Sequence, residues 1–291
     1  MELEAQCVRC LKEKEQVRAV QIEDKKLQKK YLAEIKEIID KKLYRSPPEY
    51  LDAFSQIFME KYGEVPSYGE LKTKYNQFLL QEKEEIISLI KESKDTFKAA
   101  IQAAQAGNYI DFIAMDGISE EKLKKLLLNF RDKDFDMEIY ESFKRDLDRA
   151  RKVVYFTDNC GEIVLDKILI QMIQKKYPQI NVHVIVRGSE VGNDVTMEDA
   201  IEVKLNEVAE VMGNGTTIAG TCLHRLPKRV SQIVDNADVI IAKGQGNYET
   251  LNGCGKNIYY LFLCKCNYFI EKFNTEYLAP VFCKENERSS N

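Results

Sequence analysis

Three polar, glycine-bearing segments in the second half of the chain contain the residue types that hold a metal ion and a phosphate group. Carboxylate and amide oxygens are the ligands that magnesium, manganese and similar divalent ions prefer. Glycine lets a ligand approach the backbone closely, and lysine adds a fixed positive charge. The segments are residues 158–162 (DNCGE), 192–196 (GNDVT) and 243–249 (KGQGNYE).

Two aspartates and one asparagine in these segments are the predicted metal ligands, namely Asp158, Asn159 and Asp194. Their oxygens suit magnesium, manganese or a similar divalent ion. The chain has two histidines, of which His183 lies inside an expected strand and His224 lies elsewhere. A histidine-rich zinc site is therefore not expected.

Other residues of these segments are suited to bind a phosphate group. Gly161 would let the chain turn into the next helix, whose first backbone amides are unpaired and favour an anion. Lys243 and Gly244 would bring a positive charge and an open backbone to the same place. A dinucleotide site is not predicted, because no G-x-G-x-x-G follows the first expected strand.

The elements that must position these segments alternate between strand and helix in the second half of the chain. This alternation indicates a mostly parallel, doubly wound (Rossmann-like) α/β sheet. Ligands bind beyond the carboxyl ends of the strands in such a sheet, so the three segments should meet at one edge. Strands are predicted over residues 152–157, 181–186, 211–212, 237–242 and 257–263, and helices over 163–176, 198–210 and 226–235.

The first half of the chain predicts helices instead. Apolar residues recur at spacings of three and four over residues 27–39 and 78–90, and Ser46 before two prolines predicts a helix start. We expect an all-helical domain over residues 1–148, whose first helix is able to pack back against the second domain. The expected α/β metal- and phosphate-binding domain covers residues 149–291.

Each polar segment also has a purely structural explanation. Asp158 and Asn159 could cap the helix that follows them, which is a common role of these residue types. Asp194 could be an ordinary loop residue, and Lys243 could be a solvated strand end. These explanations account for the segments one at a time, but not for their coincidence at one edge of a sheet.

Composition limits the compartment and the partners. The formal net charge of −4 gives no general attraction to nucleic acid or to an anionic membrane. The first ten residues contain no apolar run, so a signal peptide is not predicted. Eight cysteines in 291 residues are too dilute for a disulfide scaffold, and we expect reduced thiols and a cytoplasmic protein.

The three segments, in this order, resemble the motifs of the domain-of-unknown-function-89 family, the damage-control phosphatases, and most closely their prokaryotic, cysteine-bearing branch. The resemblance implies an α/β domain accompanied by a helical one. It also implies metal-dependent hydrolysis of small phosphate monoesters, such as sugar phosphates, phosphopantetheine-like compounds or damaged phosphometabolites. It extends into the helical half through residues 7–10 (CVRC), 46–49 (SPPE), 66–72 and 107–112.

The resemblance also assigns residues. The family's ligands for a manganese, cobalt, nickel or magnesium ion fall on Asp158, Asn159 and Asp194. One departure is Cys160, where a small residue such as alanine is expected, and a reactive thiol there would favour softer ions. The substrate-side residues of the family fall on Glu162, Asn193, Lys243 and Asn247.

The expected mechanism is an in-line attack on a phosphoryl group at the predicted metal. Lys243 and the amides of Gly161 and Glu162 would hold the remaining phosphoryl oxygens. Glu162 is a candidate to orient an attacking water, although an acidic residue is also favoured in the first turn of a helix for purely structural reasons. Water and the Asp158 carboxylate are both candidate nucleophiles, and water is favoured because a carboxylate committed to the metal is a poorer nucleophile.

The cysteines offer a second metal site. Cys7, Cys10, Cys264 and Cys266 could supply four thiolates to a structural zinc or iron ion if the first helix packs against the last predicted strand. Ordinary buried core cysteines are the alternative. A disulfide is disfavoured in the cytoplasm.

Two other function classes fit part of the pattern. An S-adenosylmethionine-dependent carboxyl methyltransferase would use an α/β domain with acidic strand ends, although Asp158 and Asn159 stand where its glycine-rich loop is expected. A non-catalytic phosphometabolite-binding protein would use the same pocket without hydrolysis. In the phosphatase and binding interpretations the partner is a small phosphorylated metabolite.

Overall fold

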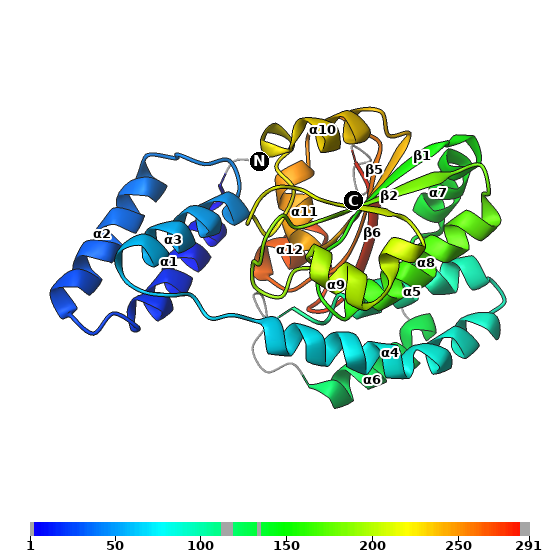
Figure 1. The fold of residues 1–291 in the computed structure, drawn as a ribbon, viewed down its shortest axis with the longest axis horizontal. Helices are drawn as coiled ribbons and strands as arrows, with labels where there is room; N and C mark the ends of the chain where they lie inside the picture. Colours follow the sequence, from blue (N-terminus) through cyan, green and yellow to red (C-terminus); the bar gives the residue numbers. More distant parts are fainter. Residues whose placement is uncertain (1–2, 112–118, 133–134, 286–291) are drawn as a thin grey trace.

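A computed structural model describes residues 3–111, 119–132 and 135–285. Within this part of the chain the strands form one sheet with the order β3-β2-β1-β4-β5-β6 (Figure 1). Neighbouring strands from β3 to β5 are parallel, and β6 runs antiparallel to β5. The strands are β1 (Lys152–Phe156), β2 (Asn181–Val186), β3 (Glu210–Gly213), β4 (Val239–Lys243), β5 (Ile258–Leu263) and β6 (Pro280–Lys284).

The strand order confirms the predicted mostly parallel, doubly wound α/β fold. From β1 the chain moves outward to β2 and β3 on one side, and then returns to place β4 and β5 on the other. The carboxyl ends of β1 and β4 therefore flank the point where the winding direction switches. Ligands bind in the crevice at such a point.

The described helices fall before and between the strands. None of them is long and apolar enough to cross a membrane, within the part of the chain that the structure describes. Those before β1 are α1 (Ala5–Ala19), α2 (Lys25–Asp40), α3 (Pro47–Lys61), α4 (Gly69–Lys91), α5 (Thr96–Gly107), α6 (Glu120–Leu128) and α7 (Met137–Arg149). Those after β1 are α8 (Glu162–Lys176), α9 (Met197–Glu202), α10 (Lys228–Asp235), α11 (Gly244–Leu251) and α12 (Asn267–Lys272).

Each face of the sheet is covered by its own helices. On one face, α4 to α8 share a continuous apolar cluster with the strands, in which Leu79, Phe143 and Val153 are fully buried. On the other face, α10 to α12 pack through residues such as Val230 and Phe269. The sheet is thus the middle layer of three.

Helices α1 to α3 stand apart from these layers and project to one side (Figure 1). They enclose a separate apolar cluster that includes Tyr31, Ile35 and Phe54. The predicted start of α3 is confirmed, with Ser46 at its N-cap and prolines in its first turn. The first helix lies against α12, where Gln6 Nε2 donates to Glu271 Oε2 over 2.5 Å. The division into domains at residue 148 remains a prediction.

Two local predictions need correction. The sequence predicts a mostly helical stretch over residues 198–210, but α9 ends at Glu202. Lys204 adopts a left-handed conformation with φ of 56°, which stops the helix before a 3₁₀ turn and β3. The antiparallel edge strand β6 does not appear among the predicted strands.

Candidate functional site

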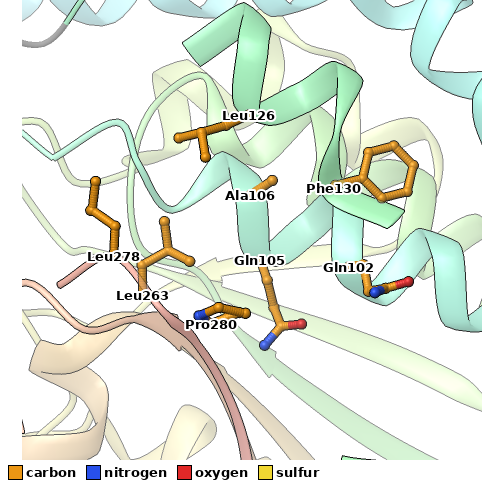
Figure 2. A pocket seen from close by; sticks show the side chains of 8 residues that line it. All are labelled: Gln102, Gln105, Ala106, Leu126, Phe130, Leu263, Leu278 and Pro280. Carbon is orange, nitrogen blue, oxygen red and sulfur yellow. The ribbon is translucent and has the colours of Figure 1, made fainter. Parts of the chain in front are cut away.

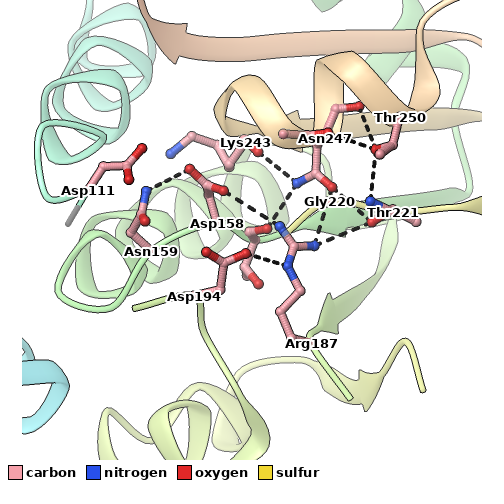
Figure 3. Close-up of polar contacts among 12 residues, drawn as sticks. Asp111, Asp158, Asn159, Arg187, Asp194, Gly220, Thr221, Lys243, Asn247 and Thr250 are labelled. Atoms are coloured by element: carbon pink, nitrogen blue, oxygen red, sulfur yellow. Dashed lines mark hydrogen bonds and ion pairs between the residues drawn. The ribbon is translucent and has the colours of Figure 1, made fainter. Parts of the chain in front are cut away.

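The loop after β1 and the loop after β2 are joined through their backbones. Asn159 and Asp194 form an isolated antiparallel bridge. Cys160 N donates to Asn193 O over 2.8 Å, and Val195 N donates to Asp158 O over 2.8 Å. The main chain therefore brings the three predicted metal ligands together, and Figure 3 shows the two aspartates near one another.

Both oxygens of the Asp158 carboxylate lie close to other side chains. Its Oδ2 accepts hydrogen bonds from Asn159 Nδ2 (2.6 Å) and Asn108 Nδ2 (2.9 Å). Its Oδ1 lies 3.6 Å from Nη2 of Arg187. Burial, and next the nearby Asp194 carboxylate, raise the pKa of Asp158 well above its ordinary value. Its surroundings therefore disfavour the ionised form of Asp158.

The Asp194 carboxylate has a similar environment. Its Oδ2 accepts from Arg187 Nε over 2.6 Å. Burial raises the pKa of Asp194 to about 6, and the Arg187 guanidinium opposes the rise. The third predicted ligand oxygen, Asn159 Oδ1, accepts from Asn193 Nδ2 over 3.0 Å. Asn193 thus orients a predicted ligand and has no open position of its own for a phosphate.

The backbone of Gly244 lies directly against the Asp158 carboxylate. Its φ is +79°, and a Cβ at this position would lie 2.0 Å from Asp158 Oδ2. Real Cβ contacts are never this short, so any other residue would displace the carboxylate. The glycine predicted to approach a phosphate instead approaches a predicted metal ligand.

Lys243 differs from the sequence expectation. Its fully buried Nζ donates to Ala104 O (2.9 Å), to Asp166 Oδ1 (2.7 Å) and to Glu162 Oε1. Burial disfavours its charge, but Asp166 and Glu162 outweigh this effect and raise the pKa of Lys243. With three protein acceptors, the ammonium group fixes Glu162 and has no donor left for a phosphate.

Glu162 lies beside the predicted ligands. Its Oε2 accepts from Asn108 Nδ2 (3.0 Å) and from the backbone N of Asn159 (3.2 Å). The carboxylate is fully buried. Glu162 therefore links the Lys243 ion pair to the ligand loop.

The backbone amides predicted to hold phosphoryl oxygens are engaged inside the protein. Gly161 N donates to Asn76 Oδ1 over 2.6 Å, and Glu162 N donates to Cys160 O over 2.7 Å. Gly161 has a φ of +68°, and a Cβ there would lie 2.6 Å from Ile110 Cδ1. The glycine is required for packing beneath α4 and α5.

Asn247 fastens two strand ends. Its Nδ2 donates to Thr157 O (3.0 Å) and to Lys243 O (2.7 Å), which follow β1 and end β4. Its Oδ1 accepts from Thr221 Oγ1 over 2.8 Å. The side chain holds the switch point together, which differs from the substrate contact that the resemblance implies.

Sequence reasoning missed several residues that surround Asp158. Arg187 directly follows β2, and Lys265 follows β5 by two positions, where it forms an ion pair with Asp111 over 2.8 Å. Both positions satisfy the rule that residues beyond strand ends build the site, so this signal was present. Asn108 is the C-cap of α5 and belongs to the 107–112 segment that the resemblance includes. Asp166 lies on α8, and the sequence contains no comparable signal for it.

Cys160 does not present a thiolate to the predicted metal. Its side chain is fully buried in the apolar cluster of α4 to α8, and Asn193 Nδ2 approaches Sγ at 3.8 Å. Burial raises the pKa of the Cys160 thiol. The expected reactive thiol is corrected to a protonated core residue.

The predicted cluster of four thiolates is not assembled. Cys7, Cys10 and Cys266 line one surface pocket between α1 and α12, but Cys264 is buried in the apolar cluster of α10 to α12. Among the described residues no three His, Cys, Asp or Glu side chains are arranged to hold a metal. The predicted site at Asp158 is not such a group, because it combines two carboxylates with an amide oxygen.

A separate small apolar pocket lies away from these residues, between α5, α6 and the β5–β6 edge (Figure 2). Its lining includes Leu126, Phe130, Leu263 and Pro280. Gln105 on its wall donates to Val281 O over 2.8 Å. None of the predicted site residues lines it, so it is not part of the candidate site.

The chain is similar in sequence to a described protein family and to several archaeal proteins. Residues 3–277 match the family described as "Damage-control phosphatase ARMT1-like domain". An uncharacterized protein of Methanocaldococcus jannaschii is 34% identical over 225 residues, covering 75% of this chain and 73% of that protein. A damage-control phosphatase of Pyrococcus horikoshii is 35% identical over 225 residues, covering 74% of each.

Two further similarities extend this result. A damage-control phosphatase of Archaeoglobus fulgidus is 30% identical over 213 residues, covering 70% of each chain. The crystal structure of a domain-of-unknown-function-89 family protein from Pyrococcus horikoshii matches with a TM-score of 0.77 and 26% identity. It covers 98% of this chain and 100% of that one.

Proposed function

Because this chain belongs to the damage-control phosphatase family with the ARMT1-like domain, we propose that it is a metal-dependent phosphatase of small phosphate monoesters. The proposed substrates are sugar phosphates, phosphopantetheine-like compounds or damaged phosphometabolites. Manganese, cobalt, nickel and magnesium are the candidate ions. We place the reaction in the cytoplasm, since all eight cysteines are free.

One observation carries the proposal. The backbone bridge between Asn159 and Asp194 holds three oxygen-bearing side chains at the switch point of a doubly wound sheet. Helix capping, the alternative for Asp158 and Asn159, receives no support, because the N-cap of α8 is Gly161 and has no side-chain cap. Both residues instead direct their side chains into the buried polar network.

The charge balance of the site fits a divalent cation. When all the groups named below are ionised, five carboxylates and three cations give the site a net charge of −2. When bound, a divalent cation supplies a Lewis acid that withdraws charge from phosphoryl oxygens. The groups counted are Asp111, Asp158, Glu162, Asp166 and Asp194, against Arg187, Lys243 and Lys265.

The remaining steps belong to the protein's own side chains. Asp158, Asn159 and Asp194 would hold the ion, and Gly244 keeps the Asp158 carboxylate in place. Glu162, fixed by Lys243, is the proposed group that orients an attacking water. Water is favoured over Asp158 as the nucleophile, because a carboxylate held by two amide donors and committed to an ion is a poorer nucleophile.

An assay of p-nitrophenyl phosphate hydrolysis with and without each ion tests the proposal. We expect metal-stimulated turnover that falls by at least about a hundredfold in Asp158→Ala and Asp194→Ala, since both remove a ligand. Asp235→Ala is the matched control, because this exposed aspartate lies on α10 and pairs only with surface groups. Circular dichroism and thermal melting establish that each variant folds.

Two results would contradict the proposal. Wild-type rates in either folded ligand variant would exclude the site. Binding of phosphorylated compounds without any turnover would support the non-catalytic binding protein instead. A panel of phosphorylated sugars and cofactor fragments then ranks the substrates by kcat/KM.

A further inference from the structure

Arg187, Lys243 and Lys265 are buried cations near the predicted metal site, and their donors are satisfied to different degrees. Lys243 donates to three protein acceptors. Lys265 forms a close ion pair with Asp111. Arg187 is 1% exposed, yet its Nη2 has no hydrogen-bond partner among the described residues.

The hydrogen bonds of Arg187 come from Nε and Nη1. Nε makes a short bond of 2.6 Å to Asp194 Oδ2. Nη1 makes only long contacts, at 3.3 Å to Asn247 Oδ1 and 3.5 Å to Thr221 Oγ1. A guanidinium carries five N–H donors, and the two on Nη2 make no hydrogen bond to a described residue. Figure 3 shows the surroundings of this group.

An unsatisfied buried charged donor is costly, which makes it informative. The nearest anionic atom to Nη2 is Asp158 Oδ1 at 3.6 Å, too far for a hydrogen bond. Asp158 is held at that distance by the amides of Asn108 and Asn159. No described residue supplies the missing acceptor, and a guanidinium prefers an anionic oxygen.

We propose that Arg187 is the phosphate-binding residue of the site, with Nη2 donating to a phosphoryl oxygen of the substrate or of the product phosphate. This inference rests on the proposed function, and it replaces Lys243 as the predicted phosphate contact. Arg187 bonds Asp194 through Nε at the same time, so it orients the phosphoryl group relative to a predicted metal ligand. Lys243 keeps its separate part of fixing Glu162.

Titration calorimetry with inorganic phosphate, at saturating manganese, tests this assignment. We expect Arg187→Met to weaken phosphate binding about ten- to hundredfold, the loss of a charge-assisted hydrogen bond. Arg187→Lys should fall between Arg187→Met and the wild type, because it retains the charge but not the fork. Manganese affinity, titrated separately, should change far less than phosphate affinity. Arg229→Met is the matched control, since Arg229 is 75% exposed and pairs with Glu210.

The following outcomes decide whether Arg187 binds the phosphate. Unchanged phosphate affinity in Arg187→Met, with weakened manganese binding, would overturn the assignment and make Arg187 a positioning residue for the ligands. If Arg187→Met does not fold, a crystal structure of the wild type with manganese and phosphate decides. A phosphate oxygen within hydrogen-bond distance of Nη2 supports the inference, and a phosphate bound away from Arg187 contradicts it.

The inference and the proposed function fail separately. Arg187-dependent phosphate binding in a protein that hydrolyses no ester would reject the phosphatase and keep the phosphate contact. Metal-stimulated hydrolysis with normal phosphate binding in Arg187→Met would keep the phosphatase and reject the contact.

Discussion

Helices α1 to α3 and helices α4 to α7 relate to the sheet in different ways. The first group closes its apolar faces on one another around Tyr31 and Phe54. The second group continues the apolar cluster of the sheet, from Leu79 to Val153. The apolar side chains of α4 to α7 are therefore buried together with those of the strands, whereas the apolar cluster of α1 to α3 contains no strand residue.

The polar contacts follow the same division. Asn76 on α4 and Asn108, the C-cap of α5, reach the candidate site, where they bond Gly161 and Asp158. Helix α3 contacts the α/β body through Asp52, which accepts from Thr217 at the rim. Helices α4 to α7 therefore support the candidate site, whereas α1 to α3 form a separate cluster beside it.

The largest expected effect comes from the shared cluster. Leu79→Ala on α4 should lower the free energy of unfolding by about 2–5 kcal/mol, because it leaves a cavity in a fully buried position. Stability of the sheet and of the candidate site should fall together, since they share this cluster. Denaturant unfolding followed by far-ultraviolet circular dichroism measures the change.

Ile35→Ala on α2 is the matched variant in the separate cluster. The loss of side chain is comparable, but we expect it to reduce hydrogen-exchange protection in α1 to α3 while the strands keep theirs. Equal loss of protection in β1 and β4 would show that the two groups of helices unfold as one unit and would remove the distinction.

A smaller effect should follow from Asn76→Ala. Asn76 Oδ1 accepts from Gly161 N, and its Nδ2 donates to Asp199 Oδ1 and Glu202 Oε2. Its loss leaves buried partners unsatisfied, which costs about 1–3 kcal/mol. The ligand loop should also loosen, so the manganese affinity should drop. Gln77→Ala, which removes only an exposed contact to Glu202, is the control. Unchanged manganese affinity in Asn76→Ala would show that α4 does not support the site.

The smallest effect concerns the pH dependence of α1 to α3. Burial raises the pKa of Glu15 above its ordinary value, and Arg18 and Tyr31 oppose only part of the rise. The folded state thus prefers the neutral acid, so its contribution to stability is complete below the ordinary pKa and is lost as pH rises through the raised pKa. Hydrogen-exchange protection of α1 to α3, corrected for intrinsic rates, should decline over that window. Glu15→Gln should remove the decline, and a decline that persists there would assign it to another group.

The sequence predicted that the loops after β1 and β2 meet, because each loop follows a strand with a strong apolar pattern. Asp158, Asn159 and Asp194 needed only the rule that parallel strands end at one edge. The same rule covers Arg187, yet a polar residue after a strand does not reveal whether its donors are satisfied. Whether they are satisfied depends on the side chains that the fold brings around Arg187, namely Asp158, Asp194, Thr221 and Asn247.

Other features depended on contacts that no local pattern contains. Lys243 ends β4 and Asp166 lies on α8, and only the fold brings them together, so the sequence could not distinguish a phosphate contact from an internal ion pair. Strand β6 is short and pairs only with β5, so its register is set by the neighbouring strand. The short length of α9 follows from the backbone conformation of Lys204 rather than from helix propensity.

The bridge between Asn159 and Asp194 has a consequence for how this site tolerates change. Main-chain hydrogen bonds do not depend on which side chains the two loops carry, so their course should survive replacement of any one ligand. Exchange of Asn159 for aspartate, or of Asp194 for asparagine, would then alter the donor set on a fixed frame. The ion selectivity of the predicted site would then be open to change one position at a time, without a change of fold.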